Sequence, residues 1–91
     1  MMIIKAIKIT PEVAIKIYEK HDVQQAEIED ALRNDNSQFW RVGGDQYAAI
    51  GLSRSRYVTI YFEYDEKTKE AEITTAYPSS KGQIKSYKRI K

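Results

Sequence analysis

The sequence predicts an α+β domain in which an N-terminal strand and a helical hairpin pack on a four-stranded antiparallel β-meander, followed by a short C-terminal helix. Apolar residues recur at helical spacing over about residues 11–33, which is typical of amphipathic helices. Alternating and β-branched runs separated by turn-forming residues then extend to residue 77, which indicates a meander. A chain of 91 residues closes one modest core, so residues 1–91 are expected to form a single domain.

The N-terminal part is expected to contain a strand at residues 3–9 and a helix that ends at about Lys20. Thr10 is suited to the N-cap, and Pro11 to the first helical position, where its missing N–H costs nothing. The residues of this helix expected to face the core are Val13, Ala14, Ile17 and Tyr18.

A second helix is expected after the break at residues 21–23. Asp22 and Gln25 have the spacing of a capping box, and the short turn predicts a hairpin of the two helices. Its core-facing residues are predicted to be Ile28, Ala31 and Leu32. The turn-favouring residues 34–37 end the helix.

The meander is expected to use strands 38–42, 46–52, 56–64 and 70–77, joined by turns at 43–45, 53–55 and 65–69. Pro78 stops the last strand, and a short helix follows from about Ser79. Trp40 is expected to be buried, anchoring the helices to the sheet. Because successive strand residues face opposite sides, Tyr57, Tyr61 and Glu63 should share the face away from Val58, Ile60 and Phe62. That face is left open for binding.

Composition excludes several classes of protein. The chain has no cysteine and one histidine, so a disulfide framework and a structural zinc site are not expected. The apolar start is interrupted by Lys5 and Lys8, too early for a signal or membrane segment, and a cytoplasmic location is expected. Residues 10–35 carry three basic and seven acidic residues, and residues 36–91 carry ten basic and six acidic. The basic half permits an anionic partner.

Four segments are similar to the RelE/ParE-like toxin superfamily, and closest to the BrnT-like ribonuclease toxins of type II toxin–antitoxin systems and related domains of unknown function. The segments are EKHDVQQAEIEDAL, QYAAIGLS, RYVTIYFEY and ITTAYPSSKGQIKSYKR, at residues 19–32, 46–53, 56–64 and 73–89. Where many of these toxins have Ser-Ala-Arg, this sequence has Thr75, Ala76 and Tyr77. The resemblance implies a RelE-like fold and metal-independent cleavage of RNA.

Such cleavage needs a base for the 2′-hydroxyl, an acid for the leaving 5′-oxygen and cations for the phosphate. In the mechanism that the resemblance implies, Glu63 or His21 is the base, Tyr87 is the acid, and Arg54, Arg56 and Lys81 stabilise the phosphate. The residues expected to contact RNA are Lys20, Arg54, Tyr61, Tyr77, Lys85 and Lys88. No metal ion or other cofactor is expected.

Each candidate also has a structural alternative. Lys81, Lys85 and Lys88 share a helix face that suits a phosphate backbone or is simply solvated. Glu63 is either a base or one member of a cross-strand ion pair. His21 is either a catalyst or a cap of the helical turn.

Tyr87 and the two arginines also have structural alternatives. Tyr87 is either part of the site or core packing. Arg54 and Arg56 are either a phosphate clamp, suited to bidentate contact, or part of a polar turn.

Two functions follow from the sequence. The first is a toxin that cleaves RNA and inhibits translation or growth, with RNA and a cognate antitoxin as partners, no membrane contact, and a homodimer left open. The second, prompted by Tyr77 in place of arginine, is a non-catalytic domain that binds a protein or RNA. A DNA-binding module is not supported, because no recognition-helix pattern is visible.

Overall fold

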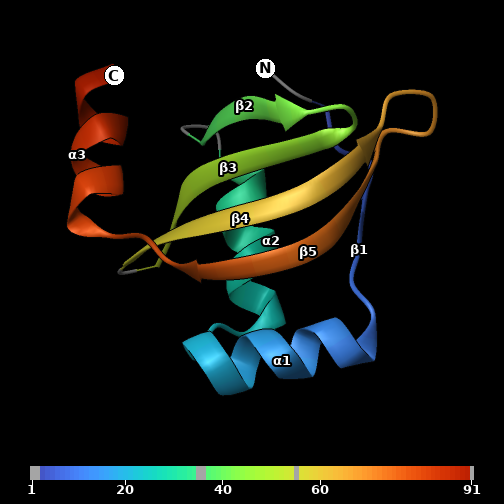
Figure 1. The fold of residues 1–91 in the computed structure, drawn as a ribbon, viewed down its shortest axis with the longest axis horizontal. Helices are drawn as coiled ribbons and strands as arrows, with labels where there is room; N and C mark the ends of the chain where they lie inside the picture. Colours follow the sequence, from blue (N-terminus) through green and yellow to red (C-terminus); the bar gives the residue numbers. More distant parts are fainter. Residues whose placement is uncertain (1–2, 35–36, 55, 91) are drawn as a thin grey trace.

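The computed structural model describes residues 3–34, 37–54 and 56–90 and confirms the α+β class (Figure 1). The predicted turn residues 35, 36 and 55 lie outside the described residues. The elements in chain order are β1 (Ala6–Lys8), α1 (Pro11–His21), α2 (Gln25–Arg33), β2 (Gln38–Gly43), β3 (Gln46–Ser53), β4 (Arg56–Asp65), β5 (Glu70–Pro78) and α3 (Lys81–Ile90).

The strands form one five-stranded sheet in the order β1-β5-β4-β3-β2. The meander β2 to β5 is antiparallel, as predicted, and β1 joins it as a fifth strand that pairs in parallel with β5, so the sheet as a whole is mixed. The reason lies in the connection. Helices α1 and α2 carry the chain from β1 at one edge to β2 at the other, and the meander returns β5 to the side of β1.

The two helices begin and end with identifiable caps. Thr10 caps α1 as predicted, accepting a hydrogen bond from the Val13 N–H at 3.2 Å. The predicted capping box of Asp22 and Gln25 is wrong: Gln24 is the N-cap of α2 and forms the box with Glu27. Asp22 instead ends α1 in the left-handed conformation, with φ of 55°, so it is not in the extended conformation that an N-cap requires.

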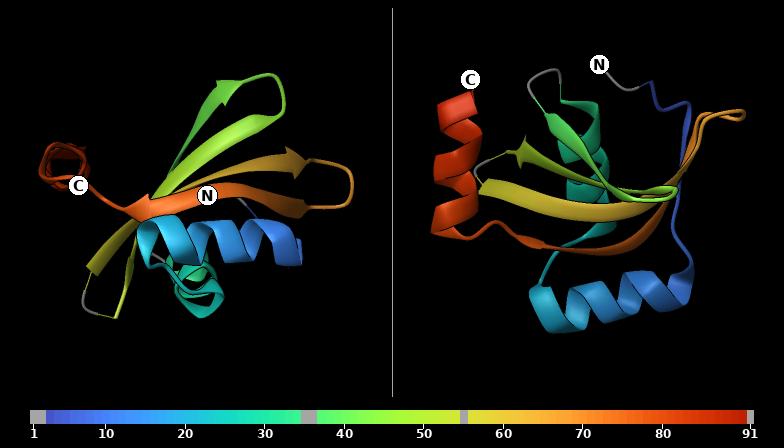
Figure 2. Two further views of the ribbon diagram at one scale, coloured as in Figure 1. Left: turned by 60° about the horizontal axis from the view of Figure 1, so that its bottom comes forward. Right: turned by 45° about the horizontal axis from the view of Figure 1, so that its top comes forward.

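The core lies between the sheet and the helices α1 and α2, which cover the same face (Figure 2). Ile28, Ala31 and Leu32 of α2 are buried there, as predicted, against Val58, Ile60 and Phe62 of β4. In α1 the buried residue is Ile17, whereas Tyr18 is 52% exposed, so the expected burial of Tyr18 is wrong. The two helices run in different directions, and α1 packs on β5 whereas α2 packs on β3 and β4 (Figure 1). Because α1 packs on the edge of the sheet, fewer of its residues are buried than its sequence pattern predicts.

The expected burial of Trp40 is also wrong. Phe39 and Trp40 are neighbours on β2, so their side chains point to opposite faces. Phe39 takes the core side, packing edge-on against Phe62 with ring centroids 6.3 Å apart. Trp40 is consequently left 43% exposed on the face away from the helices.

Helix α3 stands at one end of the sheet, apart from α1 and α2 (Figures 1 and 2). Its start is fixed by a reciprocal pair of hydrogen bonds: the Ser80 N–H donates to Gln83 Oε1 at 2.9 Å, and the Gln83 N–H donates to Ser80 Oγ at 3.1 Å. This is a capping box. Tyr87 anchors the helix to the sheet, with its ring 5.1 Å from that of Tyr57.

Candidate functional site

The face of the sheet opposite α1 and α2, here called the open face, carries two rows of side chains. The strand register aligns Gln38, Ile50, Thr59 and Tyr77 in one row, and Trp40, Ala48, Tyr61 and Thr75 in the next. The prediction that Tyr57, Tyr61 and Glu63 lie away from the buried side of β4 is confirmed. Aromatic and polar groups from β2 to β5 therefore meet on one surface.

Three of the predicted site residues come together at the β5 side of this face. The His21 ring, at the end of α1, lies 5.8 Å from the Tyr77 ring, and Tyr77 stacks on Tyr61 at 6.2 Å. Gln83 of α3 completes the group, because its Nε2 donates a hydrogen bond to the Tyr77 hydroxyl at 3.0 Å. We call these four residues the His21–Tyr77 cluster. Lys20, the residue before His21 on α1, is exposed.

Hydrogen bonds fix the phenol groups of this cluster. A hydrogen bond to Tyr77, together with burial, raises the pKa of Tyr61, so Tyr61 keeps its proton at neutral pH. Gln83 is held in turn from Thr59, whose Oγ1 donates to Gln83 Oε1 at 3.1 Å. Thr59 is fully buried. The Tyr77 hydroxyl is thus positioned by a support that extends into the sheet.

The cationic candidates of α3 lie on its outer side. Lys81, Lys85 and Lys88 are exposed, and Lys88 Nζ lies 5.9 Å from the centroid of the Tyr57 ring. Tyr87, the candidate acid, faces inward and is only 6% exposed. Burial, with a smaller contribution from Tyr57, raises the pKa of Tyr87. The structure places Tyr87 in the contact between α3 and the sheet.

The two arginine candidates lie near α2. Arg56 forms a bidentate ion pair with Glu27, with Nε–Oε2 and Nη2–Oε1 distances of 2.7 and 2.8 Å, and it also donates to the Asp22 carbonyl. Arg54 is exposed at the β3–β4 turn, where its Nε is 3.9 Å from an Asp30 carboxylate oxygen. Arg56 therefore ties the α1–α2 turn to β4.

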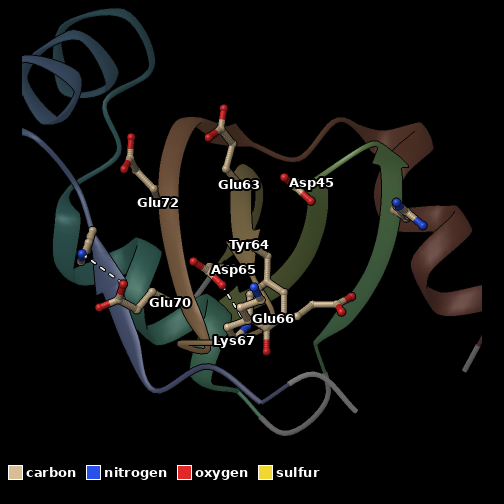
Figure 3. A pocket seen from close by; sticks show the side chains of 10 residues that line it. Asp45, Glu63, Tyr64, Asp65, Glu66, Lys67, Glu70 and Glu72 are labelled. Atoms are coloured by element: carbon tan, nitrogen blue, oxygen red, sulfur yellow. Dashed lines mark hydrogen bonds and ion pairs between the residues drawn. The ribbon is translucent and has the colours of Figure 1, made fainter.

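Glu63 lies in different surroundings from the His21–Tyr77 cluster. It lines a hollow of about 890 Å³ at the far end of the open face from α3. Figure 3 shows the carboxylates of Glu63, Glu72 and Asp45 around it. In all, six carboxylates and three cationic side chains line this acidic hollow: Asp45, Glu63, Asp65, Glu66, Glu70 and Glu72 with Lys8, Arg41 and Lys67. Glu63 is directly opposite Glu72 across β4 and β5.

Sequence reasoning did not identify Gln83, although one signal was available. The Ser80-x-x-Gln83 spacing is that of a capping box, which would have placed the start of α3 at these residues. The contact of Gln83 with Tyr77 depends on how α3 docks, and no local pattern encodes that.

The described residues contain neither a metal site nor a membrane-spanning helix. Among residues 3–34, 37–54 and 56–90, no group of three or more histidine and carboxylate side chains is arranged to hold a metal ion. Within the same part of the chain, no helix has the length and hydropathy needed to cross a membrane.

Known proteins provide a comparison for this architecture. No protein-family model matches the chain, and no curated protein does. Among solved structures, the 1.1 Å crystal structure of the Brucella abortus ribonuclease toxin BrnT is similar, with a TM-score of 0.68 at 15% sequence identity. The similarity covers 84% of this chain and 97% of that one. The chain has a BrnT-like fold. The architecture expected from the family resemblance is thereby confirmed. The His21–Tyr77 cluster and the acidic hollow both lie on this BrnT-like fold.

Proposed function

We propose that this protein is the toxin of a type II toxin–antitoxin system and an endoribonuclease that needs no metal ion. The observation that carries the proposal is the His21–Tyr77 cluster on the open face of a BrnT-like fold. An imidazole and a phenol side by side supply the two proton-transfer groups that RNA cleavage requires. The cluster draws its members from α1, β4, β5 and α3, so only the folded chain assembles it.

In this mechanism His21 takes the proton of a 2′-hydroxyl as its oxygen bonds to the adjacent phosphorus. The bond from phosphorus to the 5′-oxygen breaks, and Tyr77 gives its proton to that oxygen. The products are a 2′,3′-cyclic phosphate and a 5′-hydroxyl. Lys20, beside His21, is available to the phosphate, and the exposed lysines of α3 to the neighbouring backbone.

The assignment changes the acid of the sequence-based mechanism and chooses between its two candidate bases. Tyr77 replaces Tyr87 as the acid, because Tyr87 is buried against Tyr57. His21 is preferred to Glu63 as the base, because Glu63 lies among carboxylates that repel a phosphate. A toxin of this kind acts in the cytoplasm and is held inactive by a cognate antitoxin.

The test is cleavage of a long single-stranded RNA by purified protein in the presence of a chelator. We expect cleavage by the wild type, and a loss of about 100-fold or more in rate for His21→Asn and for Tyr77→Phe, the usual contribution of a proton-transfer group. The matched control is Tyr18→Phe, which removes a phenol hydroxyl from an exposed position on α1. An inactive wild type, or a His21→Asn variant as active as the wild type, contradicts the proposal.

A second candidate function is a non-catalytic domain that binds RNA or a protein partner. The observation that favours it is the bidentate ion pair of Arg56 with Glu27, which commits a predicted phosphate ligand to a structural contact. This function predicts that the wild type binds single-stranded RNA or a partner and leaves RNA intact.

A further inference from the structure

A second hollow, of about 690 Å³, lies between α3 and the strands β2 and β3 on the open face. We call it the α3 groove. Its apolar lining comes from Trp40, Ile50 and Tyr87, and polar groups come from the carboxamides of Gln38 and Gln83 and the hydroxyl of Ser86. Trp40 is the single tryptophan of the chain and is 43% exposed.

This lining has the chemistry of a nucleobase site. Proteins recognise unstacked bases by stacking them on aromatic rings and by hydrogen bonds from side-chain amides and hydroxyls to the base edges. Trp40 supplies an exposed ring. The half-buried carboxamide of Gln38 has no hydrogen-bond partner among the described residues, so it is available to a base edge. A purely apolar occupant would leave that carboxamide unpaired.

Charge on the open face favours nucleic acid at the α3 end. Lys81, Lys85 and Lys88 are exposed on α3, whereas the opposite end holds the acidic hollow with its excess of carboxylates. A phosphate backbone is attracted by the first and repelled by the second. Bound RNA is thereby confined to the end of the face that contains the α3 groove and the His21–Tyr77 cluster.

We propose that the α3 groove binds one unstacked base of a single-stranded RNA whose backbone continues to the His21–Tyr77 cluster. Trp40, which lines the groove, and Tyr61, which belongs to the cluster, lie in one row across β2, β3 and β4, with Ala48 between them. Strand spacing puts the two residues about 10 Å apart. One short stretch of RNA therefore reaches both. The placement next to a cleavage centre rests on the proposed function, whereas base binding in the groove is tested without cleavage.

The test uses Trp40 fluorescence, since one tryptophan makes the signal specific to the groove. The probes are the four 2′-O-methyl RNA homotetranucleotides, which cannot be cleaved because the 2′-hydroxyl is blocked. We expect saturable quenching by at least one of them. Ser86→Leu, which extends an apolar side chain from an exposed position of α3 into the groove, should weaken binding about tenfold, the scale of one lost stacking contact.

The matched control is Ser86→Ala, which removes the hydroxyl without filling the groove and should bind within about twofold of the wild type, since one exposed hydrogen bond contributes little. Trp40→Ala lacks the fluorescent side chain, so its affinity is measured by calorimetric titration. It should also bind the tetranucleotide about tenfold more weakly than the wild type. No quenching by any tetranucleotide, or a Ser86→Leu variant that binds like the wild type, overturns the proposal. The proposal is also overturned if this protein binds no RNA and a protein partner buries Trp40.

The two proposals fail independently. If long RNA is cleaved through His21 but Ser86→Leu has no effect on oligonucleotide binding, the groove assignment falls and the proposed function stands. If oligonucleotides bind in the groove and RNA is not cleaved, the groove assignment stands and the proposed function falls.

Discussion

At the residue scale, the Arg56–Glu27 ion pair holds the α1–α2 turn against the start of β4. Its two hydrogen bonds are 2.7 and 2.8 Å long, and the side chains of Arg56 and Glu27 are 35% and 20% exposed. The hydrogen bond from Arg56, opposed by burial, lowers the pKa of Glu27. The same hydrogen bond with Glu27 raises the pKa of Arg56. Bidentate, partly shielded pairs of this kind stabilise a fold more than exposed ones do.

This pair predicts a pH dependence of stability. Because the folded-state pKa of Glu27 is lowered, its contribution to the free energy of unfolding is full above the pKa of the unfolded chain and is lost as the pH falls through the folded-state pKa. Urea unfolding from pH 7 to pH 3 should show wild type losing about 1 kcal/mol more than Glu27→Gln.

The control for this measurement is Glu12→Gln, which removes an exposed carboxylate whose nearest lysine contact is 3.8 Å long. Its pH profile should follow that of the wild type. Identical profiles for wild type and Glu27→Gln would show that the ion pair contributes nothing to folding.

At the scale of elements, α2 sits directly on β3 at Gly51. A Cβ atom at this residue would overlap the carbonyl oxygen of Ala31 and the hydroxyl of Ser37. Ser37 Oγ also donates a hydrogen bond to the Ala31 carbonyl, at the point where α2 ends. The absence of a side chain at Gly51 is therefore what permits the close approach of helix and strand.

We predict that Gly51→Ala destabilises the fold by about 2 kcal/mol or more, because overpacking forces the α2 backbone to move. The measurement is the midpoint of urea unfolding followed by circular dichroism. Gly43→Ala is the matched control: a Cβ at Gly43 meets nothing within 4 Å, so that variant should stay within about 0.5 kcal/mol of the wild type. Equal midpoints for the two variants would contradict the close approach of α2 to β3.

The elements themselves could be predicted from sequence because their signals are local. Alternation placed the strands of the meander, and Thr10 and Pro11 marked the start of α1. The errors arose where two local solutions compete. Asp22 can begin a helix or end one, and the left-handed conformation that it adopts is decided by where α2 must dock. Phe39 and Trp40 are equally apolar, and only the pairing with β3 decides which one faces the core.

At the scale of the whole molecule, the site depends on register and docking more than on local pattern. Period-two alternation was enough to put Tyr61 on the open face. The contacts of Tyr77 with His21 and Gln83 join α1 and α3 to β5, and no short stretch of sequence encodes them. The charge division along the chain was visible in the sequence, but its outcome on the surface was not. Glu63, Glu70 and Glu72 belong to the basic half of the chain and nevertheless gather in the acidic hollow.

The acidic hollow should lower the affinity of the open face for RNA. Glu63 of β4 and Glu72 of β5 are directly opposite each other on adjacent strands. Both lie on the open face, as the His21–Tyr77 cluster does. Their repulsion of phosphate reaches about 10 Å at 0.1 M salt, the Debye length. The double variant Glu63→Gln, Glu72→Gln should therefore bind a single-stranded RNA several-fold more tightly at low salt, and the gain should vanish near 1 M salt, where screening shortens to about 3 Å.

The same variant separates the two candidates for the base. If His21 is the base, cleavage by the double variant persists, and it falls by about 100-fold or more if Glu63 is the base. The control variant Glu12→Gln, Glu29→Gln removes one carboxylate from the start of α1 and one from α2, the two helices that cover the other face of the sheet. Because the sheet and core separate these positions from the open face, the control should leave RNA affinity unchanged. An equal gain in both variants would mean that RNA responds only to net charge, and the division of the open face into an attracting and a repelling end would be wrong.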